Sequence, residues 1–423
     1  MEKMRAEIIA VGSEMLTPFR VDTNSLYLTD ELNRVGIEVA RKVIVGDDRA
    51  ALREAMREAL ERAEVVIAVG GLGPTEDDVT REAVAELLER KLQLNEAILR
   101  GLQERFRRFG RQMAEVNKRQ AMVPEGATPL ENKRGTAPGL WMETDGGIVI
   151  LLPGPPHELK AMFEAQVRSR LEKLSGGLRL HARELRVTGL PESDLDQRIA
   201  PIYTGYSDAQ TTVLAAPGEI QIHLRAWSRE ASAANRLLDE MVERIRFALG
   251  ETVFTTRGEE LEEVVAKLLN ENGATIAVAE SCTGGLVAQR LTSIPGSSSY
   301  FLGGVVCYSN EVKAAWVDVP EELIQEKGAV SSEVALALAE GIRRRSGASL
   351  GLGITGIAGP GGGTREKPVG TVHMALAGSA GMKERSFHFP GDRERIRQQA
   401  SQAALDMVRR YFLAKQREAG GKN

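Results

Sequence analysis

Short apolar runs alternate with amphipathic stretches over the first 174 residues of the chain. The runs at 7–11 and 65–69 are almost entirely apolar, which predicts buried strands. The same pattern predicts further strands at 38–45 and 147–152, and helices at 24–35, 49–62 and 156–174. Because strands separated by helices form right-handed βαβ units, we expect a mostly parallel sheet in a domain spanning 1–174.

The pattern changes after the Ser-Gly-Gly segment at 175–177, which we interpret as a linker. Strands are then predicted at 183–188, 211–216 and 219–227, with helices at 192–199 and 230–247. The last two strands are separated by Pro217 and Gly218, a pair typical of a hairpin turn. This βαββα order predicts a small α+β domain at 178–255.

A third domain is predicted at 258–415. Apolar residues recur at helical spacing over 261–269, and Gly273 stands where a helix C-terminal cap is expected. There follow a strand at 275–279, a helix after Thr283, a β-rich run at 300–308, a strand at 350–354, two more strands and a terminal helix. The predicted fold class is therefore α/β with three domains, the middle one small and α+β.

The length of 423 residues suits two to three domains, each with its own core. The 55 Lys+Arg and 59 Asp+Glu give a net charge of −4, which argues against a dedicated nucleic-acid or membrane-surface binder. The two cysteines, Cys282 and Cys307, are too few for a disulfide scaffold or a cysteine zinc site. The amino end carries Glu2 and Glu7, and every apolar run is short. We expect no signal peptide, no membrane span and a cytoplasmic protein.

The densest signal in the first domain is the glycine-rich segment 70–80, which follows an apolar strand and opens a helix. Its glycines let the backbone approach an anion, and free amides at a helix start can hold phosphate. Asp77 and Asp78 repel phosphate unless a divalent cation bridges them, which favours metal-assisted phosphate chemistry. The alternative is a plain tight turn in which Thr75 and Asp78 form a capping box, and spacing alone leaves both open.

Two further polar turns follow strands of the same domain. One is Gly-Ser-Glu at 12–14, and the other is Pro-Gly-Pro-Pro at 153–156. Ligands bind at the carboxyl ends of the strands in open α/β sheets, so three polar turns there favour a binding site.

Together with Asp-Thr-Asn at 22–24, these segments resemble the amino-terminal domain of CinA, the competence/damage-inducible protein A family of bacteria. That domain is similar to the three-layer molybdopterin-binding fold, and the resemblance implies hydrolysis of the ADP-ribose pyrophosphate with Mg, Mn or Co. It implies metal ligation by Asp47, Asp77 and Asp78. It implies substrate contacts from Glu14, Asn24, Gly71, Gly73, Thr75, Pro153 and Gly154. The chain departs from the family pattern at 17–20. A molybdopterin-binding or adenylylating module is the alternative.

The third domain has its own polar turns. Ala-Glu-Ser-Cys-Thr-Gly-Gly at 279–285 and the glycine-rich segment 353–360 each follow a strand, and 295–301 is rich in hydroxyls. His373 and His388 fall inside predicted strands with no Ser/Asp motif nearby, so a Ser-His-Asp triad has little support. A Ser-Lys pair remains open, because Lys313 follows an apolar strand where desolvation lowers a lysine pKa. The alternatives are a solvated Lys313, a plain turn at 297–299 and a small buried Cys282.

Residues 258–412 resemble the CinA carboxyl-terminal domain, the nicotinamide mononucleotide (NMN) amidohydrolase family. Besides those turns, the resemblance rests on Tyr-Ser-Asn…Lys at 308–313, Pro-Val-Gly-Thr-Val at 368–372 and Gly-Asp-Arg at 391–393. It implies deamidation of NMN to nicotinic acid mononucleotide and ammonia, without a cofactor. It implies Ser298 as nucleophile, Lys313 as base and Tyr308 as its orienting partner. Ser281, Thr355, Thr283, Gly284 and Gly356 would line the site, and Arg393 or Arg397 would hold the phosphate.

The middle domain resembles the small KH-like connector of CinA chains. It lacks a Gly-X-X-Gly loop with basic neighbours, so a spacer or dimer contact is expected rather than nucleic-acid binding. The basic run at 105–111 is interpreted as a solvated helix face. The resemblance also implies a homodimer. A further alternative is a competence or recombination partner without its own chemistry, which the intact Ser298, Tyr308 and Lys313 argue against.

Overall fold

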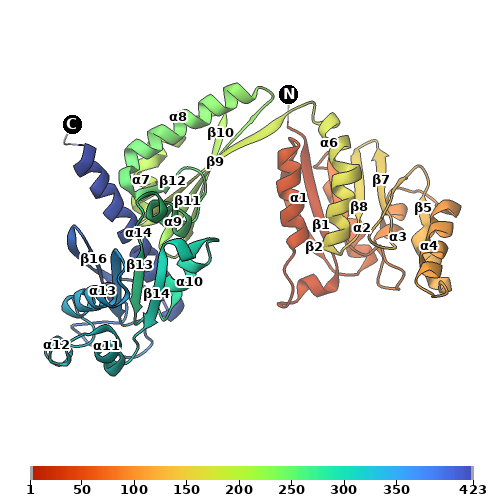
Figure 1. The fold of residues 1–423 in the computed structure, drawn as a ribbon. Coiled ribbons are helices and arrows are strands. Elements are labelled where there is room, and N and C mark those ends of the chain that lie inside the picture. Colours follow the sequence, from red (N-terminus) through yellow and green to blue (C-terminus); the bar gives the residue numbers. More distant parts are fainter. Residues whose placement is uncertain (1–2, 421–423) are drawn as a thin grey trace. The chain divides into compact units, whose positions relative to one another are not determined.

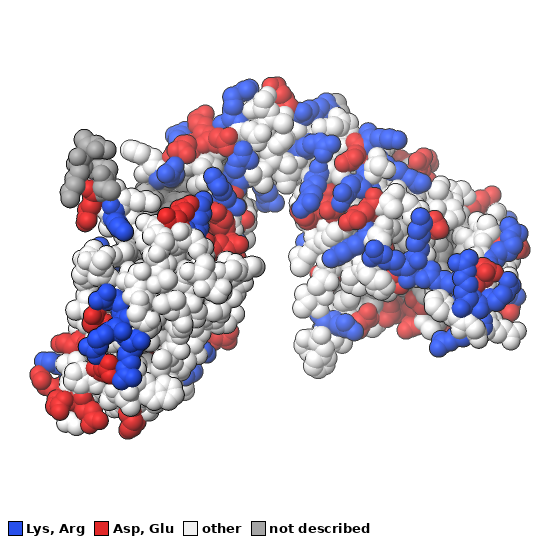
Figure 2. All heavy atoms as spheres, in the orientation of Figure 1, with Lys and Arg blue, Asp and Glu red and all other residues white. Residues whose placement is uncertain are grey.

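The computed structural model describes residues 3–420, which divide into two compact bodies. The first body holds the residues up to 181 together with 227–234, and the second holds 182–226 together with the residues from 235 on. Figure 1 colours the first body red to yellow and the second mostly green to blue. Charged side chains are spread over the face of both bodies drawn in Figure 2. Both bodies combine helices with sheets, which confirms the predicted α/β class.

The first body is built on a six-stranded sheet in the order β2-β1-β3-β8-β7-β6. The strands are β1 (Arg5–Val11), β2 (Glu38–Val45), β3 (Val65–Val69), β6 (Thr128–Leu130), β7 (Gly139–Thr144) and β8 (Gly147–Leu152). β2, β1, β3 and β8 are parallel, while β7 and β6 add antiparallel partners at one edge. Alternate residues of β3 enter different hydrophobic clusters, Ile67 in one and Val66 in the other. β3 is therefore buried on both faces, which is why its sequence is a continuous apolar run.

Helices cover this sheet and complete the first body. They are α1 (Thr23–Arg34), α2 (Arg49–Leu60), α3 (Thr80–Leu87), α4 (Glu96–Arg108), α5 (Pro156–Met162) and α6 (Arg168–Leu174). Short 3-10 turns at Ser13–Leu16 and Glu115–Ala121 and a small pair, β4 (Leu92–Leu94) with β5 (Met122–Pro124), fill the connections. The predicted single helix at 156–174 is interrupted by a π-helical turn at Phe163–Val167. Phe163 and Val167 are buried in the core, and the turn lets both pack there.

A four-stranded sheet in the order β10-β11-β9-β12 lies mostly in the second body. Its elements are β9 (Arg179–Thr188), α7 (Glu192–Tyr203), β10 (Ala209–Ala216), β11 (Glu219–Ser228), α8 (Ala231–Leu249) and β12 (Val253–Thr255). β10 and β11 pair antiparallel across Pro217 and Gly218, which confirms the predicted hairpin. Gly218 has φ +81°, a conformation that glycine adopts without strain.

The rest of the second body is a five-stranded sheet in the order β14-β13-β15-β16-β17. The strands are β13 (Ile276–Glu280), β14 (Phe301–Val306), β15 (Leu350–Gly356), β16 (Thr371–Gly378) and β17 (Gly381–His388). β14, β13 and β15 are parallel, and β16 and β17 continue antiparallel. The helices are α9 (Leu261–Glu271), α10 (Leu286–Thr292), α11 (Asn310–Val317), α12 (Glu321–Lys327), α13 (Ser332–Ser346) and α14 (Arg393–Gly420).

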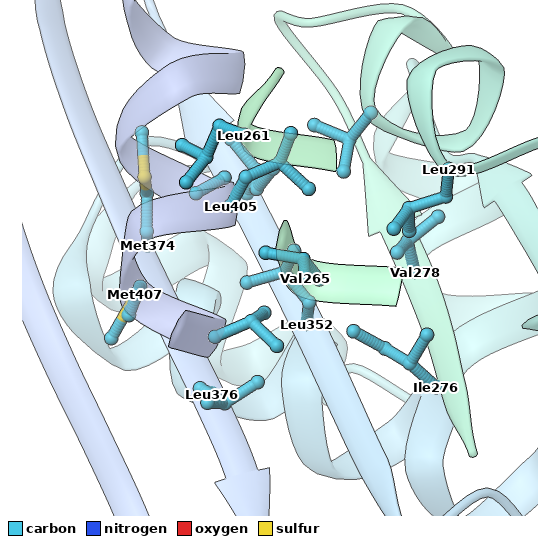
Figure 3. Packing of buried hydrophobic residues seen from close by; sticks show 14 of the residues in the cluster. Leu261, Val265, Ile276, Val278, Leu291, Leu352, Met374, Leu376, Leu405 and Met407 are labelled. Atoms are coloured by element: carbon cyan, nitrogen blue, oxygen red, sulfur yellow. The ribbon is translucent and has the colours of Figure 1, made fainter. Parts of the chain in front are cut away.

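The core of this sheet packs α9 and α14 against one face, and Figure 3 shows Leu261, Leu405 and Leu352 from the three elements meeting there. On the other face α13 lies directly on β15. A Cβ at Gly353 would stand 2.4 Å from the Ala335 carbonyl oxygen, so only glycine permits this approach. Within residues 3–420 no helix has the length and apolar character needed to cross a membrane.

Candidate functional sites

A cavity of about 560 Å³ opens at the carboxyl ends of β1, β3 and β8 in the first body. Nearly all the residues predicted for the first site line it: Glu14, Asn24, Asp47, Gly71, Gly73, Asp77, Asp78, Pro153 and Gly154. Thr75 is absent from the wall itself, and it hydrogen-bonds Asp78 instead. Arg20, from the segment that departs from the family pattern, also lies on the wall.

The glycine-rich turn after β3 is held in one conformation. The Gly70 amide donates to the Leu152 carbonyl at 2.9 Å, and the Thr80 hydroxyl donates to the Gly70 carbonyl at 2.8 Å. Gly71 has φ +63°, and a Cβ there would lie 2.2 Å from the Thr80 hydroxyl. The side chain of Arg81 is buried and donates to the Leu72 carbonyl at 2.8 Å, and burial lowers its pKa. Arg81 was not predicted from the sequence, and its hydrogen bond to Leu72 helps to hold the turn in place.

Two of the three aspartates predicted as metal ligands are fixed by backbone amides. Asp78 accepts the Thr75 amide at 2.9 Å and also the Thr75 hydroxyl. The predicted pairing of Thr75 with Asp78 in a tight turn is present, but the two residues do not cap the helix, because α3 begins at Thr80 and Val79 is its N-cap. Asp47 accepts the Ser13 amide at 2.8 Å.

Divalent-metal binding can be tested against this donor set. Within residues 3–420 no group of three or more His, Cys, Asp or Glu side chains is gathered closely enough to hold a metal ion. Asp47, Asp77 and Asp78 nevertheless face one cavity with hard oxygen donors. Mg²⁺ typically uses one or two carboxylates together with phosphate oxygens of the substrate. The residues therefore fit a cation that binds with a phosphate ligand, and they do not form a preformed cage.

Asn24 joins α1 to the turn after β8. Its side-chain amide donates to the Gly154 carbonyl at 2.7 Å, and the residue is 4% exposed. The Asn24 side-chain oxygen is buried without a hydrogen-bond partner. Buried polar atoms are normally paired, so this acceptor in the cavity wall is suited to a donor group on a ligand.

A different cluster lies at the carboxyl ends of β13, β14 and β15 in the second body. The side chain of Lys313, at the start of α11, is 2% exposed and donates to the Tyr308 carbonyl at 3.2 Å. No salt bridge to Lys313 occurs in the part of the chain that the structure describes, and burial lowers its pKa. Burial also raises the pKa of the Cys282 and Cys307 thiols, to about 12 and about 11. The thiols are therefore neutral near pH 7 and supply no counter-charge to the lysine.

The start of α14 contributes two arginines to this cluster. Arg393 is exposed and donates to the Tyr308 hydroxyl at 2.8 Å and to the Gly359 carbonyl at 2.9 Å. Arg397 is half-buried and donates to the Thr283 carbonyl at 2.9 Å. Tyr308 is 57% exposed. Its hydroxyl accepts from Arg393, and its carbonyl accepts from the buried Lys313.

Hydroxyl groups complete the cluster. Ser281 and Thr355 are almost fully buried at the ends of neighbouring strands, and Thr355 donates to the Ala329 carbonyl at 2.7 Å. The Thr283 hydroxyl is buried without a partner. The Gly284 amide donates to the Ser281 carbonyl at 3.1 Å, and a Cβ at Gly356 would lie 3.0 Å from the Cys282 sulfur.

The helix predicted after Thr283 is α10, which begins at Leu286, after Gly285. The cap comes from Glu280, which the sequence analysis missed. This carboxylate is 1% exposed and accepts the amides of Gly285, Val287 and Ala288 at 2.8–3.1 Å. The only signal for it was an acidic residue at the end of an apolar strand.

Ser298 lies away from this cluster. It belongs to the 3-10 turn Ser297–Ser299, which precedes β14, whereas Tyr308 and Lys313 follow β14. The neighbouring Ser299 hydroxyl donates at 2.8 Å to the Asn270 side chain, near the end of α9, at the amino ends of β13 and β14. Six residues of β14 span about 20 Å. One chain therefore brings Lys313, Tyr308, Ser281 and Thr355 to the carboxyl ends of the parallel strands and places Ser298 at their amino ends.

Known proteins similar to this chain cover it from end to end. A CinA-like protein of Solibacter usitatus is 52% identical over 98% of this chain and 100% of its own length. This chain belongs to the CinA family. A putative competence-damage inducible protein of Symbiobacterium thermophilum is 45% identical over 97% of the chain and 99% of its own length.

Family models divide this CinA-family chain into three parts. The CinA C-terminal domain matches residues 258–412, the probable molybdopterin binding domain matches 7–173, and the damage-inducible protein CinA KH domain matches 182–255. The predicted resemblance and the three-domain α/β class are thereby confirmed. The crystal structure of the protein CinA from Thermoplasma acidophilum is 34% identical and covers 40% of this chain and 98% of its own, with a TM-score of 0.37.

Proposed function

We propose that the CinA C-terminal domain hydrolyses the amide of NMN, releasing nicotinic acid mononucleotide and ammonia. The observation that carries this proposal is Lys313, a buried lysine with a lowered pKa and no salt bridge in residues 3–420. Burial favours the neutral form of such a lysine, and a neutral lysine can take a proton from a hydroxyl. The surrounding hydroxyls and arginines can bind and orient a nucleotide substrate.

The chemistry follows from these groups. Neutral Lys313 accepts the proton of the Ser298 hydroxyl as its oxygen attacks the amide carbon. The carbon–nitrogen bond then breaks, and ammonia leaves with the proton that Lys313 returns. Water attacks the resulting ester carbon and gives a proton to Lys313. The bond from that carbon to the Ser298 oxygen then breaks, Lys313 passes the proton to the Ser298 oxygen, and the acid product leaves as a carboxylate after releasing its remaining proton to solvent. Within one chain Ser298 and Lys313 lie at opposite ends of β14.

Arg393 is the proposed phosphate ligand of NMN. It is exposed, and its guanidinium already bridges Tyr308 and the loop at Gly359. Arg397 is half-buried and directed at the Thr283 carbonyl, which suits a role in holding the turn. The Thr283 hydroxyl, buried without a partner, is available to the substrate.

Ammonia release from NMN tests this function. We expect the full chain to release ammonia from NMN but not from nicotinamide, and Lys313→Ala to lose the activity. Lys327→Ala is the matched control, because Lys327 is an exposed lysine on α12, and it should keep wild-type turnover. A folded wild-type chain that releases no ammonia would overturn the proposal.

For the first body we propose hydrolysis of the pyrophosphate of ADP-ribose with Mg²⁺, Mn²⁺ or Co²⁺. The supporting observation is a cavity of about 560 Å³ that combines a rigid glycine turn with Asp47, Asp77 and Asp78. A bound cation would neutralise phosphate charge and make the phosphorus more electrophilic. The chain itself would hold the phosphates at the turn amides and orient the ribose through the free Asn24 oxygen.

The test is formation of AMP and ribose 5-phosphate from ADP-ribose, with and without a chelator. Chelator-sensitive formation supports the proposal. Adenylyl transfer from ATP to a pterin, with no ADP-ribose cleavage, would instead support the molybdopterin-module alternative. If the chain cleaves neither NMN nor ADP-ribose and transfers no adenylyl group, the better explanation is that it acts as a competence or recombination partner without its own chemistry.

A further inference from the structure

The two edges of the five-stranded sheet differ sharply in charge. β17, at one edge, carries Lys383, Glu384 and Arg385. β14, at the other edge, pairs only with β13 and lies within the stretch 291–309, which contains no Asp, Glu, Lys or Arg. The whole chain is 27% charged, so this gap is unusual. Solvent-exposed edge strands are usually protected by charged side chains, so the absence of charge indicates that β14 is covered.

The surface around β14 is also apolar. Leu302 and Val306 are each 49% exposed on the strand, and Trp316 on α11 is 60% exposed. Figure 2 shows a nearly charge-free area on the second body over the region where Figure 1 places β14 and α10. This edge therefore offers unpaired backbone groups together with apolar side chains.

The position of Ser298 identifies what covers the edge. Ser298 is exposed, and its hydroxyl has no hydrogen-bond partner among residues 3–420. Ser298 and Tyr308 lie at equal distances in sequence on either side of Gly303, in the middle of β14. In an antiparallel pair of two β14 strands centred on Gly303, the turn that holds Ser298 would lie near the end of the other strand, where the chain continues to Tyr308. A Cβ at Gly303 would meet no atom within 4 Å, so the backbone is accessible there.

We propose that β14 pairs antiparallel with β14 of a second copy of this chain, so that each deamidase site takes Lys313 and Tyr308 from one copy and Ser298 from the other. The contact is isologous, since the same segment meets itself about a two-fold axis. A different partner protein would cover the apolar edge but would not bring Ser298 to Lys313. The proposal rests on the deamidase function proposed above.

Complementation between two inactive variants tests the shared site. Full chains with Ser298→Ala or Lys313→Ala are produced together with different affinity tags, and the species carrying both tags is isolated. Each variant alone should be inactive, whereas the mixed dimer has one intact site of two and should recover about half of the wild-type turnover. Failure to isolate a species with both tags, or an inactive mixed species, overturns the proposal. An inactive wild-type chain would instead overturn the deamidase function.

The edge can be tested separately by charge. Leu302→Lys places a charge on the β14 edge and should lower the sedimenting mass of the full chain and abolish ammonia release from NMN. Met382→Lys is the control, because Met382 is 54% exposed on β17 and already has charged neighbours. It should leave mass and activity unchanged. Wild-type mass for Leu302→Lys overturns the pairing, whether or not the deamidase function holds.

Discussion

The two candidate sites differ in the charged side chains on which they are built, carboxylates in the first body and a lysine in the second. The cavity of the first body is lined by carboxylates, two of them, Asp47 and Asp78, held by backbone amides. These carboxylates repel a phosphate group unless a cation neutralises their charge. The cluster in the second body is built around Lys313, buried beside neutral thiols. Its desolvation supplies a base without any added ion. The first site therefore depends on a cation that arrives with the ligand, whereas the second already contains its reactive group.

The largest expected effect comes from removing that reactive group. Lys313→Met should lower deamidation of NMN about 10³-fold, because the base is lost, while ADP-ribose hydrolysis stays at the wild-type rate. The variant should unfold at an equal or higher temperature, since methionine needs no water at this buried position. Ammonia release, AMP formation and thermal unfolding measure the three quantities. Parallel loss of both activities would contradict two independent sites.

A change of similar kind in the first body should have the reverse selectivity. Asp78→Asn keeps the size of the side chain but removes its charge, so cation-dependent ADP-ribose hydrolysis should fall on the order of 10²-fold while deamidation is unchanged. Asp145→Asn is the control, because Asp145 is exposed in the turn between β7 and β8. If Asp78→Asn cleaves ADP-ribose normally, the carboxylate wall is not the metal site.

Arg393 should affect binding more than chemistry. Arg393→Ala removes the proposed phosphate contact, so the KM for NMN should rise about tenfold with a smaller change in kcat. Arg365→Ala, at an exposed arginine in the loop between β15 and β16, serves as the control. An unchanged KM would move the phosphate site to Arg397.

The lowered pKa of Lys313 also predicts a dependence of stability on pH. Between the lowered folded value and the ordinary value of 10.5, the unfolded chain binds more protons at this lysine than the folded chain does. Its contribution to the free energy of unfolding should therefore rise as pH rises through this window. Urea unfolding at a series of pH values should show a steeper rise for the wild type than for Lys313→Met. Equal slopes would mean that the lysine is charged in the folded protein.

The smallest effect is expected at Glu280. Glu280→Gln weakens the acceptor that holds three amides at the start of α10, and should cost about 2 kcal/mol of unfolding free energy. Glu366→Gln, at an exposed position, should cost nothing measurable. Urea unfolding of the two variants checks the difference. Equal free energies of unfolding for the two variants would show that water replaces Glu280 as the acceptor of these amides.

Most of the fold followed from local pattern. Continuous apolar runs such as Val65–Val69 identify central parallel strands, and Pro217 with Gly218 identifies a hairpin. The π-helical turn at Phe163–Val167 was missed, because it is set by packing rather than by periodicity. Short strands such as β6 were missed because three residues carry little periodic signal.

The sites were predicted as sets of turns, and their internal geometry was not. The capping role of Glu280 and the burial of Arg81 depend on neighbours distant in sequence. Proximity in sequence was misleading for Ser298, which is ten residues from Tyr308 but separated from it by the length of a strand. The direction of each strand, rather than the spacing in the sequence, decides which polar turns lie at the same end of the sheet.

The most direct test of this account is ammonia release from NMN by the full chain and by Lys313→Met, measured at neutral pH on samples shown to be folded. The account predicts release by the wild type and a loss of about 10³-fold in the variant. A silent wild type, or a variant as active as the wild type, would contradict the claim that the buried lysine is the catalytic base.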